Sequence, residues 1–240
     1  KTLDSAVGRL GEPVIRKAMI EAMRMMGRQF VLGRTIEEAV KNAKDYEKKG
    51  YRMSYDMLGE GARTAEDSER YFNVYKEALA KISGAAEGKA RPGMSVKLSA
   101  LYPRYEFRHA DRCVPEMTEK LLVLARQAAN ANIALTVDAE EVDRLEISLR
   151  IIEAVAADPS LNGWEGFGLA IQAYSKRCFA LIDHLAEFAQ EHKRKLQVRL
   201  VKGAYWDADI KRAQVQGLSD YPVFTRKANS DLSYIACARK

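Results

Sequence analysis

Charged and amide side chains stand at or near the ends of several short apolar stretches of this sequence. The clearest case is Leu196–Val201, which contains Arg199 and runs into the turn Lys202-Gly203-Ala204 and a helix expected to begin near Trp206. An arginine keeps its proton, so an inward-facing Arg199 needs an anionic or strongly accepting partner. Four other apolar stretches end in comparable side chains, namely Asp56, Lys97, Asp138 and Gln172. If these stretches are parallel strands of one sheet, their polar ends converge on a single mouth.

The chemistry of such a mouth follows from the residue types. Lys97 and Arg199, with Asp138 and Gln172 nearby, could hold an anionic substrate or cofactor, with a bound group supplying the redox or electrophilic chemistry. None of the three histidines stands at a strand end, and no His, Cys and Asp cluster has metal-ligand spacing. No GxSxG nucleophile motif is present. The sequence therefore predicts neither a metal site nor a serine nucleophile.

The elements that would position these residues begin with a helical lead-in, predicted for residues 1–50. Pro13 is expected in the first turn of a helix that follows Gly11-Glu12, with a stripe of methionines packed as core. A second helix should open at Thr35, because Glu38 completes a capping box, and should stop at Gly50.

Residues 51–240 show short apolar stretches that alternate with amphipathic helical patterns. The strand starts lie about 30 to 42 positions apart, the size of a βα repeat with parallel neighbours. An open nucleotide-binding sheet would need GxGxxG after its first strand, and Gly59-Glu60-Gly61 lacks the third glycine. The pattern favours an α/β fold of the (βα)8 TIM-barrel type, with about five of its eight units in this chain. The predicted strands are Arg52–Met57, Met94–Ser99, Ala134–Asp138, Gly168–Gln172 and Leu196–Val201.

Composition excludes some classes of protein. The 240 residues carry 39 Lys and Arg against 33 Asp and Glu, a net charge of +6 spread along the helices, which is typical of a mixed solvated surface and not of a nucleic-acid-binding stripe. The three cysteines are far apart and fit a reducing compartment. No apolar run approaches the length of a membrane span, and no signal-peptide pattern opens the chain. Because the sequence begins at Lys1, we expect it to be a fragment.

Six motifs in fixed order carry a family resemblance over essentially the whole chain. They are YDMLGE, SVKLSALYPRY, VDAEE, IQAY, RLVKGAYWD and YPVFTRK. Together with the lead-in, they resemble the proline dehydrogenase domain of the bacterial proline utilization A family. The resemblance implies a distorted barrel that binds FAD without a Rossmann motif. It also implies oxidation of L-proline to Δ1-pyrroline-5-carboxylate by hydride transfer from proline C5 to flavin N5, with electrons passed to a membrane quinone.

The resemblance also implies roles for individual residues. Arg199 would lie beside flavin N5, Lys97 would face the proline carboxylate, and Asp138 would lie in the active site, although it could also simply neutralise Lys97 or Arg199. Tyr205 would pack near the substrate ring, and Glu60 would gate the site by pairing with an arginine of the last barrel helix. The FAD-lining residues would be Gln172, Arg199, Val201, Lys202, Gly203, Ala204, Trp206, Thr225, Arg226 and Lys227.

The cellular setting is implied in the same way. We expect a cytoplasmic homo-oligomer, peripheral to the inner membrane, fused in the full enzyme to a pyrroline-5-carboxylate dehydrogenase domain. That domain, the closing strands and the last-helix arginines lie outside residues 1–240, and no nucleic-acid-binding module is expected within them.

Two other hypotheses remain open. One is a Schiff-base barrel lyase with Lys97 or Lys202 as the nucleophile. The other is a non-enzymatic protein that binds RNA or lipid headgroups through Arg104, Arg108 and Arg112.

Overall fold

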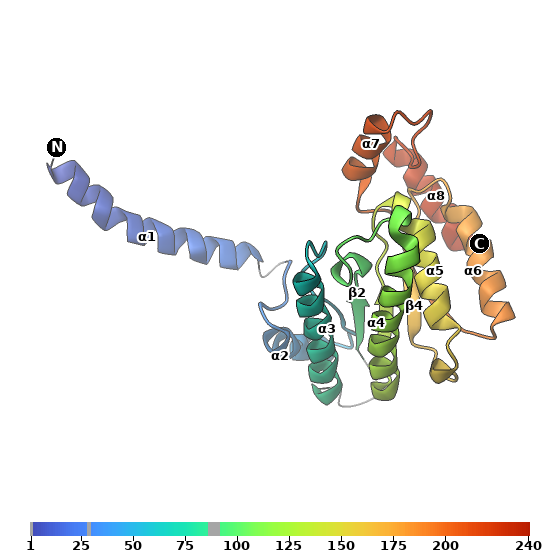
Figure 1. Cartoon of the computed structure of the whole chain (residues 1–240). Coiled ribbons are helices and arrows are strands. Elements are labelled where there is room, and N and C mark those ends of the chain that lie inside the picture. Colours follow the sequence, from blue (N-terminus) through green and yellow to red (C-terminus); the bar gives the residue numbers. More distant parts are fainter. Residues whose placement is uncertain (1, 28–29, 86–91) are drawn as a thin grey trace. The chain divides into compact units, whose positions relative to one another are not determined.

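The computed structural model describes residues 2–27, 30–85 and 92–240, and the chain divides into two compact units between Arg52 and Met53 (Figure 1). The first unit contains α1 (Thr2–Gly27) and α2 (Ile36–Glu47). The predicted capping box is confirmed, because Thr35 Oγ1 accepts the Glu38 N–H at 3.2 Å and the Glu38 carboxylate accepts the Arg34 N–H at 2.9 Å. No helix in the described ranges is both long and apolar enough to cross a membrane.

Two expectations for α1 are wrong. The helix does not begin near Pro13 but runs through it. A proline removes one backbone donor and introduces a local clash, and here a helix of 26 residues continues on both sides of it. The methionines are not core either, since Met19, Met23 and Met26 are 60–64% exposed. Apolar periodicity identifies the residues that share a helix face, but it does not say what covers that face.

The second unit is built on five parallel strands that follow one another in sequence order. They are β1 (Ser54–Asp56), β2 (Gly93–Val96), β3 (Ala134–Val137), β4 (Phe167–Gln172) and β5 (Gln197–Val201). A doubly wound sheet reverses its strand order at a switch point, whereas a barrel adds each strand beside the previous one. The observed order β1-β2-β3-β4-β5 is that of successive units of a (βα)8 barrel, and the predicted α/β class is confirmed.

The helices between and after the strands cover the outer face of the sheet. Figure 1 shows α3, α4 and α5 side by side along it, with α7 beyond the carboxyl ends of the strands. Short 3-10 helices are found at Leu98–Ala100, Phe107–His109, Val142–Arg144 and Pro159–Leu161. The long helices are α3 (Ala65–Ala85), α4 (Ala110–Ala131), α5 (Leu145–Ala156), α6 (Cys178–Glu191), α7 (Trp206–Val215) and α8 (Lys227–Arg239).

Strand register explains which side chains face away from these helices. Asp56 pairs with Ser95, Ser95 with Thr136, and Ala170 with Arg199. Because side chains alternate along a strand, these positions share one face, and the intervening apolar residues point into the helical layer. Met94, Val96, Leu135 and Val137 are accordingly buried. The polar face is therefore set by the same alternation that builds the core.

Candidate active site

Four charged side chains meet on the polar face at the carboxyl ends of β1, β2, β3 and within β5. Lys97 Nζ lies 2.8 Å from Asp138 Oδ2 and 3.0 and 3.2 Å from the two carboxylate oxygens of Asp56. The guanidinium of Arg199 pairs with Asp138 Oδ1 and donates to Ser95 Oγ at 3.0 Å. We call Asp56, Lys97, Asp138 and Arg199 the charged basin. Asp138 bridges both cations, so it neutralises each of them in part.

Burial differs sharply within the basin. The side chains of Asp138 and Lys97 are 9% and 16% exposed, whereas those of Arg199 and Asp56 are 45% and 50% exposed. Burial acts to lower the pKa of Lys97, but the hydrogen bonds and charges of Asp138 and Asp56 outweigh it and raise this pKa above its usual value. Lys97 therefore carries a proton at neutral pH. An ammonium group can clamp an anion, but it cannot attack a carbonyl as a Schiff-base nucleophile does.

The role of Asp56 was missed in the sequence, although its position at a strand end was the signal that could have found it. Strand ends are commonly polar, and only the register shows that this carboxylate reaches the lysine of the next strand. Tyr75 of α3 was not predicted as a site residue either. Its hydroxyl accepts the Lys97 backbone N–H at 3.2 Å and so holds the backbone of Lys97 in place directly after β2.

Gln172 does not join the charged basin, although it stands at the end of β4. Its Nε2 donates to the Glu140 carbonyl at 2.8 Å, and its Oε1 accepts the Ala204 N–H at 3.1 Å. The side chain thus ties the loop after β3 to the turn after β5. A buried amide satisfies its donor and acceptor on the nearest backbone groups, and here these belong to the loops and not to the basin.

Glu140 is a third residue that sequence reasoning missed. It is buried, accepts the Ser99 N–H at 2.9 Å and pairs with Arg144 at 2.7 Å. Burial raises the pKa of Glu140, opposed by the Ser99 N–H and the Arg144 charge. Ser99 in turn accepts the Gly61 N–H on its hydroxyl at 3.0 Å and the Ala62 N–H on its carbonyl at 2.9 Å. The loops after β1, β2 and β3 are therefore connected through one carboxylate.

The turn between β5 and α7 is open to solvent. Lys202, Gly203 and Ala204 follow Val201 and are exposed, and Trp206 Nε1 donates to the Phe224 carbonyl at 3.0 Å. Thr225 and Arg226 precede α8 on the exposed surface. Lys202 and Lys227 both pair with Asp231, at 2.6 and 2.7 Å. Hydrogen bonding to Asp231 raises the pKa of Lys202, so Lys202 stays charged beside this carboxylate.

The structure gives Glu60 a partner within the chain. Tyr205 Oη donates to Glu60 Oε2 at 3.0 Å, which links the loop after β1 to the residue directly before α7. Burial and this hydrogen bond raise the pKa of the Tyr205 hydroxyl. The expected pairing of Glu60 with an arginine of the last barrel helix is not tested by this structure and stays a prediction.

The fold and the basin together define a barrel-type α/β domain with fixed charges at the carboxyl ends of its strands, where the active sites of such barrels lie. A family model, "Proline dehydrogenase", matches residues 39–240. The chain belongs to the proline dehydrogenase family.

Two sequence relatives and one solved structure define the resemblance. The chain is 50% identical over 243 residues to the bifunctional protein PutA of Salmonella typhimurium, covering 100% of the chain and 18% of that protein. It is 29% identical to proline dehydrogenase 1 of Bacillus subtilis, covering 76% of the chain and 53% of the relative. A crystal structure of Bradyrhizobium japonicum proline utilization A superposes with a TM-score of 0.83 at 56% identity, covering 97% of this chain and 24% of that one. The chain thus spans less than a fifth of the bifunctional relative.

Proposed function

We propose that this chain supplies part of an FAD-dependent proline dehydrogenase that oxidises L-proline to Δ1-pyrroline-5-carboxylate, with residues 1–50 as a helical lead-in and 51–240 as the first five barrel units. The observation that carries the proposal is the charged basin, in which Asp138 holds Lys97, whose pKa is raised, beside Arg199 on the inner face of the sheet. Family membership supports the substrate.

The residues around the β5–α7 turn fit FAD. The face of β5 that carries Arg199 leads to an exposed turn, and the two lysines at Asp231 leave a net positive charge suited to a pyrophosphate. Gln172, Val201, Lys202, Gly203, Ala204, Trp206, Thr225, Arg226 and Lys227 are the residues that we propose hold it. When bound, FAD supplies the acceptor for the hydride that leaves proline C5. Arg199 would favour the electron-rich reduced ring through its fixed positive charge.

The remaining basin residues act on the substrate. Lys97 Nζ makes three contacts, two with Asp56 and one with Asp138, and we propose that the proline carboxylate takes the place of one of the two contacts with the half-exposed Asp56. Asp138 fixes the relative position of Lys97 and Arg199, and hence of substrate and cofactor. Tyr205 would pack near the substrate ring, and Glu60 would gate entry. As proline is oxidised, its nitrogen loses a proton to solvent and the C5–N double bond forms.

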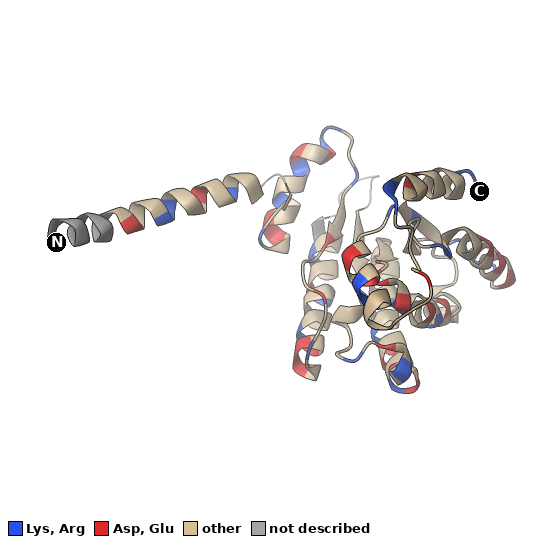
Figure 2. Ribbon diagram, turned by 90° about the horizontal axis from the view of Figure 1, so that it is seen from above, with Lys and Arg blue, Asp and Glu red and all other residues tan. Residues whose placement is uncertain are grey.

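Further partners are proposed from the bifunctional relatives. These are a fused pyrroline-5-carboxylate dehydrogenase domain, a membrane quinone as electron acceptor, and a cytoplasmic homo-oligomer that attaches to the inner membrane peripherally. Figure 2 shows Lys and Arg interleaved with Asp and Glu along the helices of residues 53–240. Such mixed charge is typical of a solvated surface and not of a nucleic-acid-binding stripe.

The test uses the full-length protein that contains this chain. We expect it to purify with a flavin absorbance that L-proline bleaches under anaerobic conditions. Lys97→Met should lower kcat/KM for proline at least about 30-fold, because a desolvated charge contact is lost. Lys176→Met is the matched control, since Lys176 forms an exposed pair with Asp220. A flavin-free wild type, or a Lys97→Met variant bleached as fast as wild type, would contradict the proposal.

A further inference from the structure

Asp209 is a buried carboxylate in the first turns of α7, outside the charged basin. It is 2% exposed, and both of its oxygens are used. One accepts the Tyr174 hydroxyl and the other accepts the Val142 N–H at 3.1 Å. In the part of the chain that the structure describes, no lysine or arginine forms an ion pair with it. Burial raises the pKa of Asp209. Burying such a group costs free energy, so its position in the fold calls for a physical reason.

Tyr174 supports the β5–α7 turn directly. Its backbone N–H donates to the Lys202 carbonyl at 2.7 Å, and its carbonyl accepts the Phe224 N–H at 2.8 Å. Its ring lies against Gly203, where a Cβ would come within 2.3 Å of Tyr174 Cδ1. Gly203 has a φ of +144°, so the turn is held in a conformation that other residues rarely adopt. Tyr174 therefore supports this turn twice, through its backbone hydrogen bond to Lys202 and through the packing of its ring against Gly203.

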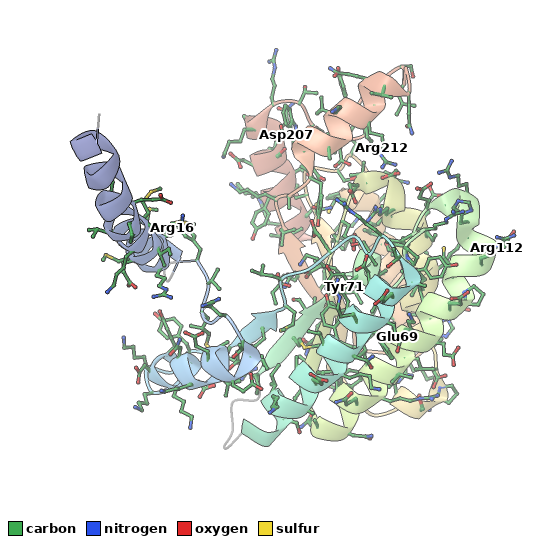
Figure 3. The ribbon with its side chains drawn as sticks, turned by 60° about the vertical axis from the view of Figure 1, so that its left-hand side comes forward. Arg16, Glu69, Tyr71, Arg112, Asp207 and Arg212 are labelled. Atoms are coloured by element: carbon green, nitrogen blue, oxygen red, sulfur yellow. The ribbon has the colours of Figure 1, made fainter. Side chains whose placement is uncertain are left out.

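The two residues join two loops and a helix at one point. Val142 belongs to the loop after β3, Tyr174 to the loop after β4, and Asp209 to the helix after β5. A second link, the ion pair between Arg212 and Asp143, fastens α7 to the loop after β3. Figure 3 shows Arg212 and Asp207 on α7, with Arg212 toward the loops at the strand ends. The buried carboxylate thus orients α7 with respect to the turn that precedes it.

We propose that Asp209 and Tyr174 form a positioning pair that sets the conformation of the Lys202–Ala204 turn and, through it, the affinity and environment of the flavin. This inference rests on the proposed function. Within the described ranges, neither side chain hydrogen-bonds or ion-pairs with the charged basin, and the pair acts through backbone that lines the proposed cofactor site. Loss of the pair should loosen the turn while the strands and their core remain.

The decisive variant is Tyr174→Phe in the full-length flavoenzyme, because it removes only the hydroxyl and keeps the ring on Gly203. We expect FAD binding to weaken about tenfold, as for a lost hydrogen bond to a buried charge, with a changed visible circular dichroism spectrum of the bound flavin. Tyr221→Phe is the matched control, since its hydroxyl accepts a 3.2 Å hydrogen bond from Gln214 at an exposed site. It should leave both readouts unchanged.

Asp209 provides a graded series. An amide at this position can still accept from Val142 and donate to the Tyr174 oxygen, so Asp209→Asn should retain more FAD affinity than Asp209→Ala. Asp207→Ala, at an exposed site two residues earlier, should have no effect. If Asp209→Ala does not fold, Tyr174→Phe alone decides the question.

The outcomes separate the two proposals. A wild-type protein without flavin overturns the proposed function, and this inference with it. A flavin-containing wild type whose Tyr174→Phe variant keeps the same FAD dissociation constant and the same flavin spectrum, while unfolding at a lower temperature, shows that the pair is only structural. That result overturns the positioning role and leaves the proposed function intact.

Discussion

The two carboxylates that hold Lys97 allow a sharp test of how the charged basin is stabilised. Asp138→Asn removes the negative charge shared by Lys97 and Arg199, at a side chain that is 9% exposed. Asp56→Asn removes the other partner of the same lysine, at a side chain that is 50% exposed. The two substitutions are identical in chemistry and differ in burial and in the number of cations served.

The expected magnitudes follow from these contacts. Opposite unit charges about 4 Å apart interact by about 4 kcal/mol at an effective dielectric constant of about 20, and breaking a fully buried pair costs about 3–5 kcal/mol. Because Arg199 is 45% exposed, we reduce this to about 2 kcal/mol for Asp138→Asn. That lowers the folding equilibrium constant about 30-fold. For Asp56→Asn we expect less than about 1 kcal/mol, as for exposed pairs.

The assay is equilibrium unfolding in urea, at low salt and at about 1 M salt, where the screening length falls to about 3 Å. The effect of Asp56→Asn should shrink in high salt, and that of Asp138→Asn should persist, with unchanged m-values for both. Equal losses, or a larger loss for Asp56→Asn, would refute the reasoning that burial and bridging make Asp138 the central residue of the basin.

Two further predictions concern Tyr75 and Gly203. Burial raises the pKa of Tyr75 to about 12, against about 10 in the unfolded chain, so the unfolded state loses its proton first and stability should fall as pH rises from about 10 to about 12. Tyr75→Phe should therefore make the free energy of unfolding, measured in urea, depend less steeply on pH over that window, by the equivalent of up to one proton. Tyr51→Phe, at an exposed side chain, should leave the pH dependence unchanged. An unchanged pH dependence in Tyr75→Phe would contradict this prediction. Gly203→Ala should cost about 3 kcal/mol by urea unfolding, because it adds a clash with Tyr174 to a positive-φ strain. Gly217→Ala, with a positive φ of +61° and open space, should cost about 1 kcal/mol, and equal losses would argue against the clash.

Much of the sheet could be predicted from the sequence because burial on one face imposes a simple pattern. The predicted strand Ala134–Asp138 matches β3 to within one residue, whereas the predicted strand Met94–Ser99 runs past the end of β2 at Val96, because Leu98–Ala100 form a 3-10 helix. The capping residues of α2 were equally readable, since Thr35 and Glu38 act within one turn. Features that depend on residues close in the sequence, or on strict alternation along a strand, can therefore be predicted from the sequence alone.

The failures concern partners rather than elements. Nothing near Gln172 in the sequence says that its amide will bind the backbone of residues 140 and 204, because those groups are 32 positions away on either side. The prediction for the methionines of α1 is wrong for the same reason, because periodicity shows which residues share a helix face but not what packs against that face. Asp209 is a further case, because a carboxylate in the first turns of a helix is typical of an exposed residue, and only the tertiary structure buries it.

The balance of charge in the basin constrains how it can work. Two neighbouring cations alone would repel each other, but Asp138 and Asp56 supply two negative charges beside Lys97 and Arg199, so the cluster is formally neutral before any ligand arrives. A neutral, hydrogen-bonded cluster holds its geometry without a ligand, and that is the condition for a preorganised site. An anion must then be attracted by N–H groups of Lys97 and Arg199 that point toward it, and not by a net positive charge of the cluster. This favours a compact zwitterion, which brings a carboxylate together with its own positive charge, over a substrate of large negative charge.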